Sequence, residues 1–148
     1  MTETVPSIHG WGYQGRSVEE LVAFARTQGV TTVIDVRLNP ISRKPGFSKR
    51  RLEESLRRSG IAYIHRPELG NPKDNRPGFA APGTAAGREA HRRFECEVLA
   101  TDSAAAALSE VDRLARETGV VLLCFESDES LCHRALVRDA ATGTLAVV

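Results

Sequence analysis

Residues 119–139, GVVLLCFESDESLCHRALVRD, decide the fold of this chain. The segment is apolar without interruption from Val120 to Phe125, which is typical of a strand buried on both faces of a parallel sheet. Polar residues 127–130 then form a loop, and a helix is predicted over residues 131–140. A buried strand that leads through a short loop into a helix is the repeating unit of an α/β domain.

The rest of the chain repeats this unit. Strands are predicted at 5–10, 31–37 and 61–65, and residues 144–148, TLAVV, are expected to add a short fifth strand. Helices are predicted between Ser17 and Gly29 and over 48–58, 88–100 and 103–118, with Ser48 and Asp102 as caps of the second and fourth. We therefore predict one three-layer α/β domain over residues 1–148. Its central sheet is mostly parallel, with four or five strands and helices on both faces.

Residues 70–90 interrupt this alternation. The wider stretch 66–89 holds four prolines and shows neither a helical nor a strand period. Long loops inside a compact domain are uncommon and are usually functional or disordered. We expect a long mobile loop over 70–90.

The composition narrows the class of protein. The chain has 148 residues, a net charge of +1 and no apolar run near the roughly 18–20 residues that span a bilayer, so no membrane segment is expected. Three cysteines are an odd and sparse set, which predicts free thiols and a cytoplasmic location. The start, MTETVPSIHGWG, lacks the basic and apolar regions of a secretory signal.

A local basic region lies within this nearly neutral chain. Residues 37–58 carry eight arginines and lysines against only Glu53 and Glu54. One interpretation is a solvated helix face. The other is an anionic partner, because the planar arginine side chain binds phosphate or carboxylate with two hydrogen bonds.

Polar side chains follow all four main strands at the point where each strand ends. These are His9, then Asp35 and Arg37, then His65, Arg66 and Glu68, then Cys124 and Glu126 followed by Cys132, His133 and Arg134. Because the carboxyl ends of parallel strands share one edge of the sheet, we predict that these groups converge there, where such folds bind ligands.

Three interpretations of Cys132 remain open. At the start of a helix it would be a nucleophile or redox thiol with a lowered pKa, with His133 or His65 as its base. Cys132, Cys124 and a histidine would alternatively bind zinc, although their spacing matches no usual zinc motif. In the third interpretation the helix start binds an anion and Cys132 is only a packing residue, as we also expect for Cys124 and Cys96.

Asp35 and Glu126 are candidate carboxylates for acid–base chemistry or for a divalent cation. They would lie close together if the second and fourth strands are neighbours. In the alternative interpretation, Asp35 forms an internal ion pair that orients Arg37 or Arg134.

Three segments resemble the signature blocks of the domain of unknown function family 488. They are DVRLNPISRKPGFSK (35–49), GIAYIHRPELGNP (60–72) and LLCFESDESLCHR (122–134). The resemblance implies a small α/β fold and no established activity. It also implies a set of motif positions, which are Asp35, Arg37, Pro40, Ser42, Arg43, Tyr63, His65, Leu69, Gly70, Cys124, Glu126, Cys132, His133 and Arg134. The chain departs from the family pattern at IHGWG and at its short tail.

These observations favour a pocket at the strand ends that binds an anionic ligand. The ligand is predicted to be a phosphate-bearing small molecule, a nucleotide or a nucleic acid, and the pocket residues would suit hydrolase or transferase chemistry. The candidate catalytic residues are Cys132, His133, His65, Glu126 and Asp35, and the candidate ligand-binding residues are Arg37, Ser42, Arg43, Tyr63 and Arg134. The alternatives are a non-catalytic nucleic-acid or nucleotide-binding module and a thiol-based sulfurtransferase or redox protein using Cys132. No cofactor is required by the sequence, a divalent metal remains open, and the oligomeric state is not indicated.

Overall fold

Four parallel strands form the centre of the fold in the computed structural model, which describes residues 7–128 and 131–146. They are β1 (Ile8–Gly12), β2 (Thr32–Asp35), β3 (Ala62–His65) and β4 (Val120–Cys124), in the order β1-β4-β2-β3. All three strand pairs are parallel. The apolar segment that decides the fold is therefore an inner strand, and all five residues of β4 are buried.

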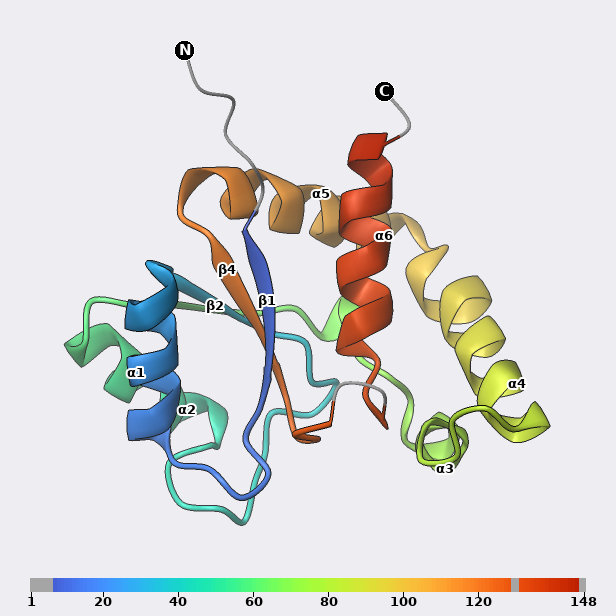
Figure 1. Ribbon diagram of the computed structural model, residues 1–148, viewed down its shortest axis with the longest axis horizontal. Coiled ribbons are helices and arrows are strands. Elements are labelled where there is room, and N and C mark those ends of the chain that lie inside the picture. Colours follow the sequence, from blue (N-terminus) through green and yellow to red (C-terminus); the bar gives the residue numbers. More distant parts are fainter. Residues whose placement is uncertain (1–6, 129–130, 147–148) are drawn as a thin grey trace.

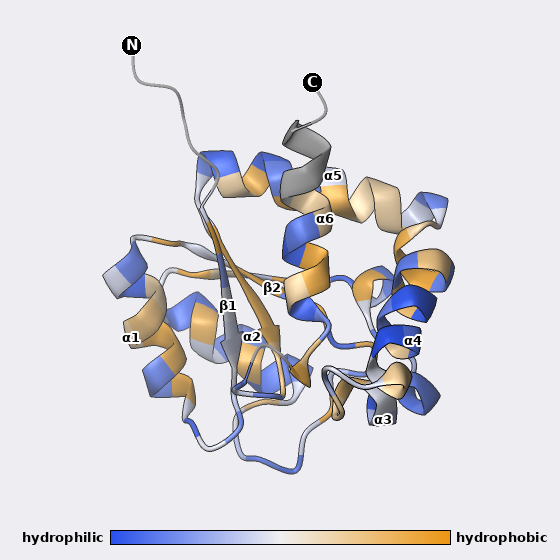
Figure 2. Cartoon of the chain, turned by 45° about the vertical axis from the view of Figure 1, so that its right-hand side comes forward, coloured by the Kyte–Doolittle hydropathy of each residue, from blue (hydrophilic) through white to orange (hydrophobic). Residues whose placement is uncertain are grey.

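Helices cover both faces of this sheet, as predicted (Figure 1). On one face, α1 (Val18–Gln28) and α2 (Lys49–Arg58) pack against Val33, Val121 and Leu123. The other face includes Ile34 and Leu122 and is covered by later elements. These are α4 (Ala85–Arg93), the π-helix η3 (Phe94–Leu99), α5 (Asp102–Glu117) and α6 (Arg134–Ala146). In Figure 2 the middle of the sheet has the hydrophobic colour, and the helices have hydrophobic and hydrophilic sides.

The segment expected as a long loop at 70–90 is instead partly helical. After η1 (Pro67–Leu69), the chain forms η2 (Lys73–Asn75), α3 (Arg76–Phe79) and the start of α4. Tertiary contacts hold these short turns, because Asn75 Nδ2 donates to Asn71 Oδ1 and to the Ala90 carbonyl, and Phe79 is buried. Turns of three or four residues carry no sequence period, which is why the pattern did not reveal them.

The predicted end of the chain was wrong. Residues 144–146, expected in a fifth strand, continue α6, and residues 147–148 lie outside the described part. The described residues contain four strands. Helix α6 also begins at Arg134 rather than at residue 131, and the helix predicted over 88–100 changes to π-helix after Arg93.

The helix caps were predicted with mixed success. Ser17 Oγ accepts from the N–H of Glu20, as the capping pattern predicts. Ser48 precedes α2 but makes no cap hydrogen bond and instead binds the backbone of Ser42. Thr101, not Asp102, caps α5. Across the described residues, no helix combines the length and apolar character needed to cross a membrane.

Candidate functional site

A cavity of about 260 Å³ lies at the carboxyl edge of the sheet. The chain leaves β1 and β2 towards α1 and α2 on one face, and leaves β4 towards α6 on the other. Adjacent strands whose connections go to opposite faces leave a crevice between them, where open α/β sheets bind ligands. The cavity is lined by Tyr13, Arg37, Asn39, Ile41, Ser42, Arg43, Asn71, Arg76, Phe79, Cys124, Phe125, Glu126, Leu131, Cys132 and His133.

Asp35 does not line this cavity. Its side chain is fully buried and lies on the α1–α2 face, because Asp35 pairs in register with Leu123, which packs against those helices. The carboxylate accepts from Arg37 Nε at 2.8 Å, from Arg37 Nη2 at 2.6 Å and from the Tyr63 hydroxyl at 2.6 Å. The alternative in which Asp35 orients Arg37 through an internal ion pair is thus the one the structure supports.

Arg37 and Tyr63 belong to the same polar cluster as Asp35. Arg37 Nη1 donates to the Phe47 carbonyl at 2.7 Å and lies 3.4 Å from the Tyr13 hydroxyl. Burial, followed by the charge of Asp35, raises the pKa of Tyr63, which keeps its hydroxyl protonated as a donor. Arg37 reaches the edge of the cavity, while most of its guanidinium donors are occupied inside the protein.

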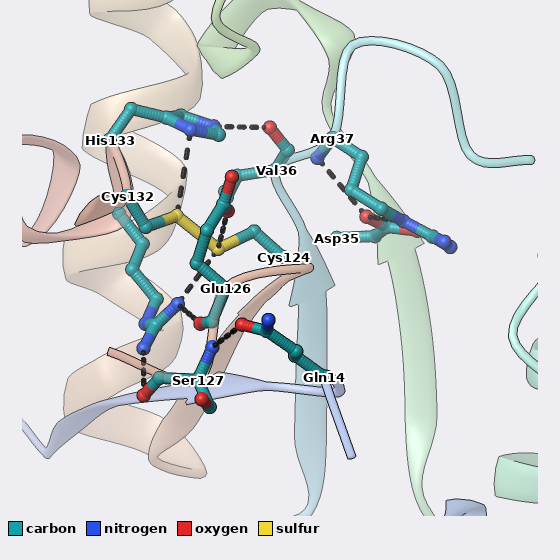
Figure 3. Close-up of a disulfide and its surroundings, with 10 residues drawn as sticks. Gln14, Asp35, Val36, Arg37, Cys124, Glu126, Ser127, Cys132 and His133 are labelled. Atoms are coloured by element: carbon teal, nitrogen blue, oxygen red, sulfur yellow. Dashed lines mark hydrogen bonds and ion pairs between the residues drawn. A yellow bond between two sulfur atoms is a disulfide. The ribbon is translucent and has the colours of Figure 1, made fainter. Parts of the chain in front are cut away.

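His65 is aligned with Asp35 in the neighbouring strand, and its Nε2 lies 2.8 Å from the Arg37 carbonyl. It is not part of the cavity lining. Among the groups expected to converge, Asp35 and His65 therefore lie together beside Arg37, whereas Glu126 lines the cavity. Figure 3 shows Glu126 directed towards the two cysteines, with Asp35 and Arg37 off to one side.

Cys124 and Cys132 form a disulfide at the cavity wall. The expectation of free thiols therefore holds only for Cys96, which is exposed rather than in the core. Cys124 is not merely a packing residue, and Cys132 is not a free thiolate in this state. Cys132 and His133 also precede α6 instead of forming its first turn, since the His133 carbonyl accepts from the N–H of Val137.

His133 lies between the disulfide and the sheet. Its Nε2 is 2.8 Å from the Val36 carbonyl, and its Nδ1 is 3.7 Å from Cys132 Sγ. A carbonyl only accepts, so Nε2 carries the proton of this hydrogen bond. Desolvation by burial, with the positive charges of Arg76 and Arg134, lowers the pKa of His133 to about 4. The imidazole is neutral near pH 7, with the lone pair of Nδ1 facing sulfur.

Arg134 is buried beside the disulfide. Its Nη1 lies 2.8 Å from Cys124 Sγ and 2.5 Å from the Glu126 carbonyl, and Nη2 donates to the Ser127 carbonyl. It holds the loop after β4 against the start of α6. Arg134 does not line the cavity, contrary to its expected role in holding an anion there.

Two exposed arginines from different segments line the cavity. Arg43 comes from the loop after β2, and Arg76 from the first turn of α3. Neither forms an ion pair with a carboxylate of the described residues. Among the lining residues that the structure describes, Glu126 is the acidic one. Ser42 also lines the cavity and accepts from the N–H of Lys44.

The sequence interpretation missed several lining residues. Arg76, Asn71 and Phe79 come from the segment expected to be a loop, and Arg76 carried no periodic signal. A different signal could have identified Asn71, because this residue directly follows the Leu69-Gly70 pair of the family pattern. Tyr13 follows the first strand, where ligand-binding residues were expected.

The fold and cavity define a three-layer α/β protein with a polar crevice at the carboxyl ends of its parallel strands. Residues 17–141 match the family described as "Domain of unknown function DUF488", and the chain belongs to this family. No curated protein and no solved structure matches the chain significantly.

Proposed function

We propose that the cavity binds a small phosphate-bearing ligand with an apolar or aromatic part, such as a nucleotide. The observation that carries this proposal is the pair Arg43 and Arg76. Both guanidinium groups line the cavity, and neither has a carboxylate partner among the described residues. A guanidinium binds phosphate through two charge-assisted hydrogen bonds, so two of them favour an anion.

Apolar groups at the same cavity support a ligand that is more than an inorganic anion. Ile41 is 72% exposed and Phe125 is 46% exposed, and both line the cavity. Large exposed apolar groups in a concave site are typical of ligand contacts. The Phe125 ring stands edge-on to Tyr13 with centroids 5.3 Å apart, which leaves Phe125 held in place for stacking.

Calorimetric titration with adenosine monophosphate, adenosine and inorganic phosphate tests the proposal. We expect the nucleotide to bind most tightly. Arg43→Gln and Arg76→Gln should each weaken it by about 10-fold or more, since a hydrogen bond to a charged group contributes roughly 1.5–3 kcal/mol. Arg57→Gln is the matched control, because Arg57 is exposed on α2 and absent from the cavity. Equal losses in all three variants, or no binding by wild type, would refute the proposal.

Turnover separates an enzyme from a binding module at this site. Within the described part of the chain, Glu126 is the carboxylate that lines the cavity, since Asp35 is engaged by Arg37 and Tyr63. Hydrolase or transferase chemistry would convert the nucleotide to a product, and the Glu126→Gln variant would form this product more slowly. Binding that weakens with salt and yields no product would identify a non-catalytic module, and tighter binding of single-stranded oligonucleotides would identify nucleic acid as its partner.

A second candidate function rests on the disulfide at the cavity wall. A dithiol substrate could reduce the Cys124–Cys132 bond, transferring two electrons and two protons to the sulfurs and becoming a disulfide itself. Wild-type protein should then catalyse exchange between a small dithiol and a small disulfide, and Cys132→Ser should abolish it. Equal rates in both proteins would exclude the redox function and the sulfurtransferase alternative that also uses Cys132.

A further inference from the structure

We propose that the reduced Cys124–Cys132 pair, together with Glu126 and His133, is a binding site for a thiophilic divalent metal of the zinc type. The site would lie at the inner wall of the cavity, where Figure 3 shows Glu126 beside the disulfide and His133 Nδ1 facing Cys132. This inference is independent of the proposed anion binding, because none of the four ligands is an arginine.

Three donor groups lie close enough together to share one metal ion, and His133 Nδ1 adjoins them through Cys132. Sulfur about 2.3 Å and nitrogen or oxygen about 2.0–2.2 Å from zinc place neighbouring donors roughly 3.5–3.8 Å apart. Cys124 Sγ lies 3.7 Å from Glu126 Oε2, and Cys132 Sγ lies 3.7 Å from His133 Nδ1. The ligand atoms of Cys124, Glu126 and Cys132 all lie within 4.8 Å of one another.

Backbone positions leave room for an ion. The Cα atoms of Cys124 and Cys132 are 7.4 Å apart, beyond the roughly 4.4–6.8 Å that is usual for disulfides. Two thiolates joined through a metal stand farther apart than two bonded sulfurs. The separation therefore suits a bridged dithiolate without movement of β4 or α6.

Neighbouring groups hold these ligands as metal sites require. The Val36 carbonyl accepts from His133 Nε2, which turns the unprotonated Nδ1 towards Cys132. Metal-binding histidines commonly donate their other ring N–H to a carbonyl in this way. Arg134 Nη1 lies 2.8 Å from Cys124 Sγ, so its charge stabilises a thiolate there.

The spacing explains why the sequence did not predict this site. Two ligands come from the end of β4, as Cys124 and Glu126, and two from the residues before α6, as Cys132 and His133. Each pair comes from one short segment, and the loop between them matches no usual zinc motif. The fold, not a local motif, brings the two pairs together.

Metal binding requires the reduced protein. A dithiol reductant breaks the S–S bond, delivers two electrons and two protons to the sulfurs, and leaves as a disulfide. The divalent ion then displaces both thiol protons and binds two thiolates, since the thiolate is the form that ligates metals. A disulfide oxidant reverses this, because it takes two electrons from the thiolates and leaves as two thiols while the Cys124–Cys132 bond forms again and the ion is released.

Anaerobic titration of the full chain with Co²⁺ tests the site, because thiolate–cobalt charge transfer reports sulfur ligation directly. A phosphine reductant with water prepares the protein, forming the phosphine oxide and the two thiols. We expect one Co²⁺ per reduced wild-type chain with charge-transfer absorption, displaced by Zn²⁺, and none for the oxidised protein.

The variants separate this site from other thiol binding. Cys124→Ser and Cys132→Ser should lose the charge-transfer signal, whereas Cys96→Ser, the matched control at the exposed free thiol, should keep it. Glu126→Gln and His133→Gln should weaken binding by at least the roughly 10–100-fold that loss of an outer-shell group costs. His133→Gln keeps a donor for the Val36 carbonyl, so its fold should be retained, which far-ultraviolet circular dichroism checks.

Two outcomes would overturn the proposal. One is no charge-transfer signal from reduced wild-type protein, and the other is an equal loss of signal in Cys96→Ser and Cys132→Ser. The glutamate and histidine variants keep the proposal testable if a serine variant does not fold. Adenosine monophosphate binding, measured on the same samples, shows separately whether the anion proposal fails.

Discussion

Asp35 and Arg37 form a buried ion pair in which one carboxylate accepts from the Arg37 backbone N–H, Nε and Nη2. The Asp35 side chain is 0% exposed and that of Arg37 is 5% exposed. Tyr63 adds a hydrogen bond from β3, so the pair connects two strands and the loop after β2. We conclude that this motif pair holds the edge of the sheet on which the cavity is built.

Breaking the pair should destabilise the fold strongly. Asp35→Asn leaves the Arg37 charge buried without a partner, which typically costs about 3–5 kcal/mol. Urea denaturation should show this loss in the free energy of unfolding. Arg58→Gln is the control, because its pair with Glu54 is exposed and worth at most about 1 kcal/mol. A loss below 1 kcal/mol for Asp35→Asn would contradict the assignment.

Glu110 should make stability depend on pH. A hydrogen bond from Arg66, opposed by partial burial and aided by the charge of Arg66, lowers the pKa of Glu110 below its ordinary value of 4.5. As the pH falls, Glu110 is therefore protonated in the unfolded chain before it is protonated in the folded protein. The Glu110–Arg66 interaction stabilises the fold above pH 4.5, and this stabilisation is lost as the pH falls through the pKa of Glu110 in the folded protein. Glu110→Gln should be less stable than wild type at pH 7, and the difference should shrink below pH 4. A difference constant from pH 7 to pH 3 would exclude this.

Gly70 should tolerate no side chain. A Cβ at this position would lie 2.5 Å from the backbone N and Cα of Leu38, so the loops after β2 and β3 touch there. Gly70→Ala should destabilise by about 1–3 kcal/mol or more through overpacking and should weaken ligand binding, since Asn39 and Asn71, which follow the two contact residues in the chain, line the cavity. Gly60→Ala, with open space but a φ of 76°, should cost only about 1–2 kcal/mol and leave binding intact.

Thiol counting should reveal the redox state of the pair. Alkylation of the oxidised, denatured protein should label Cys96 alone, and prior reduction should raise the count to three. Mass spectrometry of the fragment that joins residues 124 and 132 identifies the bond. Three labelled cysteines without reduction, in protein purified under air, would show that the disulfide does not form.

The sequence predicted the layers of the fold because β2 and β4 lie in short apolar runs with several β-branched residues, and Gly29 and Gly119 precede these runs. It could not predict strand order, since β4 enters between β1 and β2 through contacts that no local pattern encodes. The helices of 70–90 were missed for a related reason. They depend on Asn75 and Phe79 making tertiary contacts, not on amphipathic repeats.

Some of the residues predicted for the site line the cavity and others do not. Glu126, Cys132, His133, Arg37, Ser42 and Arg43 line the cavity, whereas Asp35, His65, Tyr63 and Arg134 lie outside its lining. Side-chain alternation accounts for part of this difference. Asp35 faces α1 and α2 with Val33, while Cys124 packs with the core of the opposite face. The register of a strand decides to which face of the sheet its last side chains point, and one sequence does not specify this register.

The position of β4 has a consequence for synthesis on the ribosome. Among the described strands β1 pairs with β4 alone, so the first strand to emerge has no neighbour until residues 120–124 have left the exit tunnel. Until then β1 and one edge of β2 remain open to pairing with other chains, and long-range strand pairing is slow. We expect the nascent chain to depend on holding chaperones until nearly all of it is made, and C-terminal truncation before residue 120 to yield aggregates rather than a smaller folded domain.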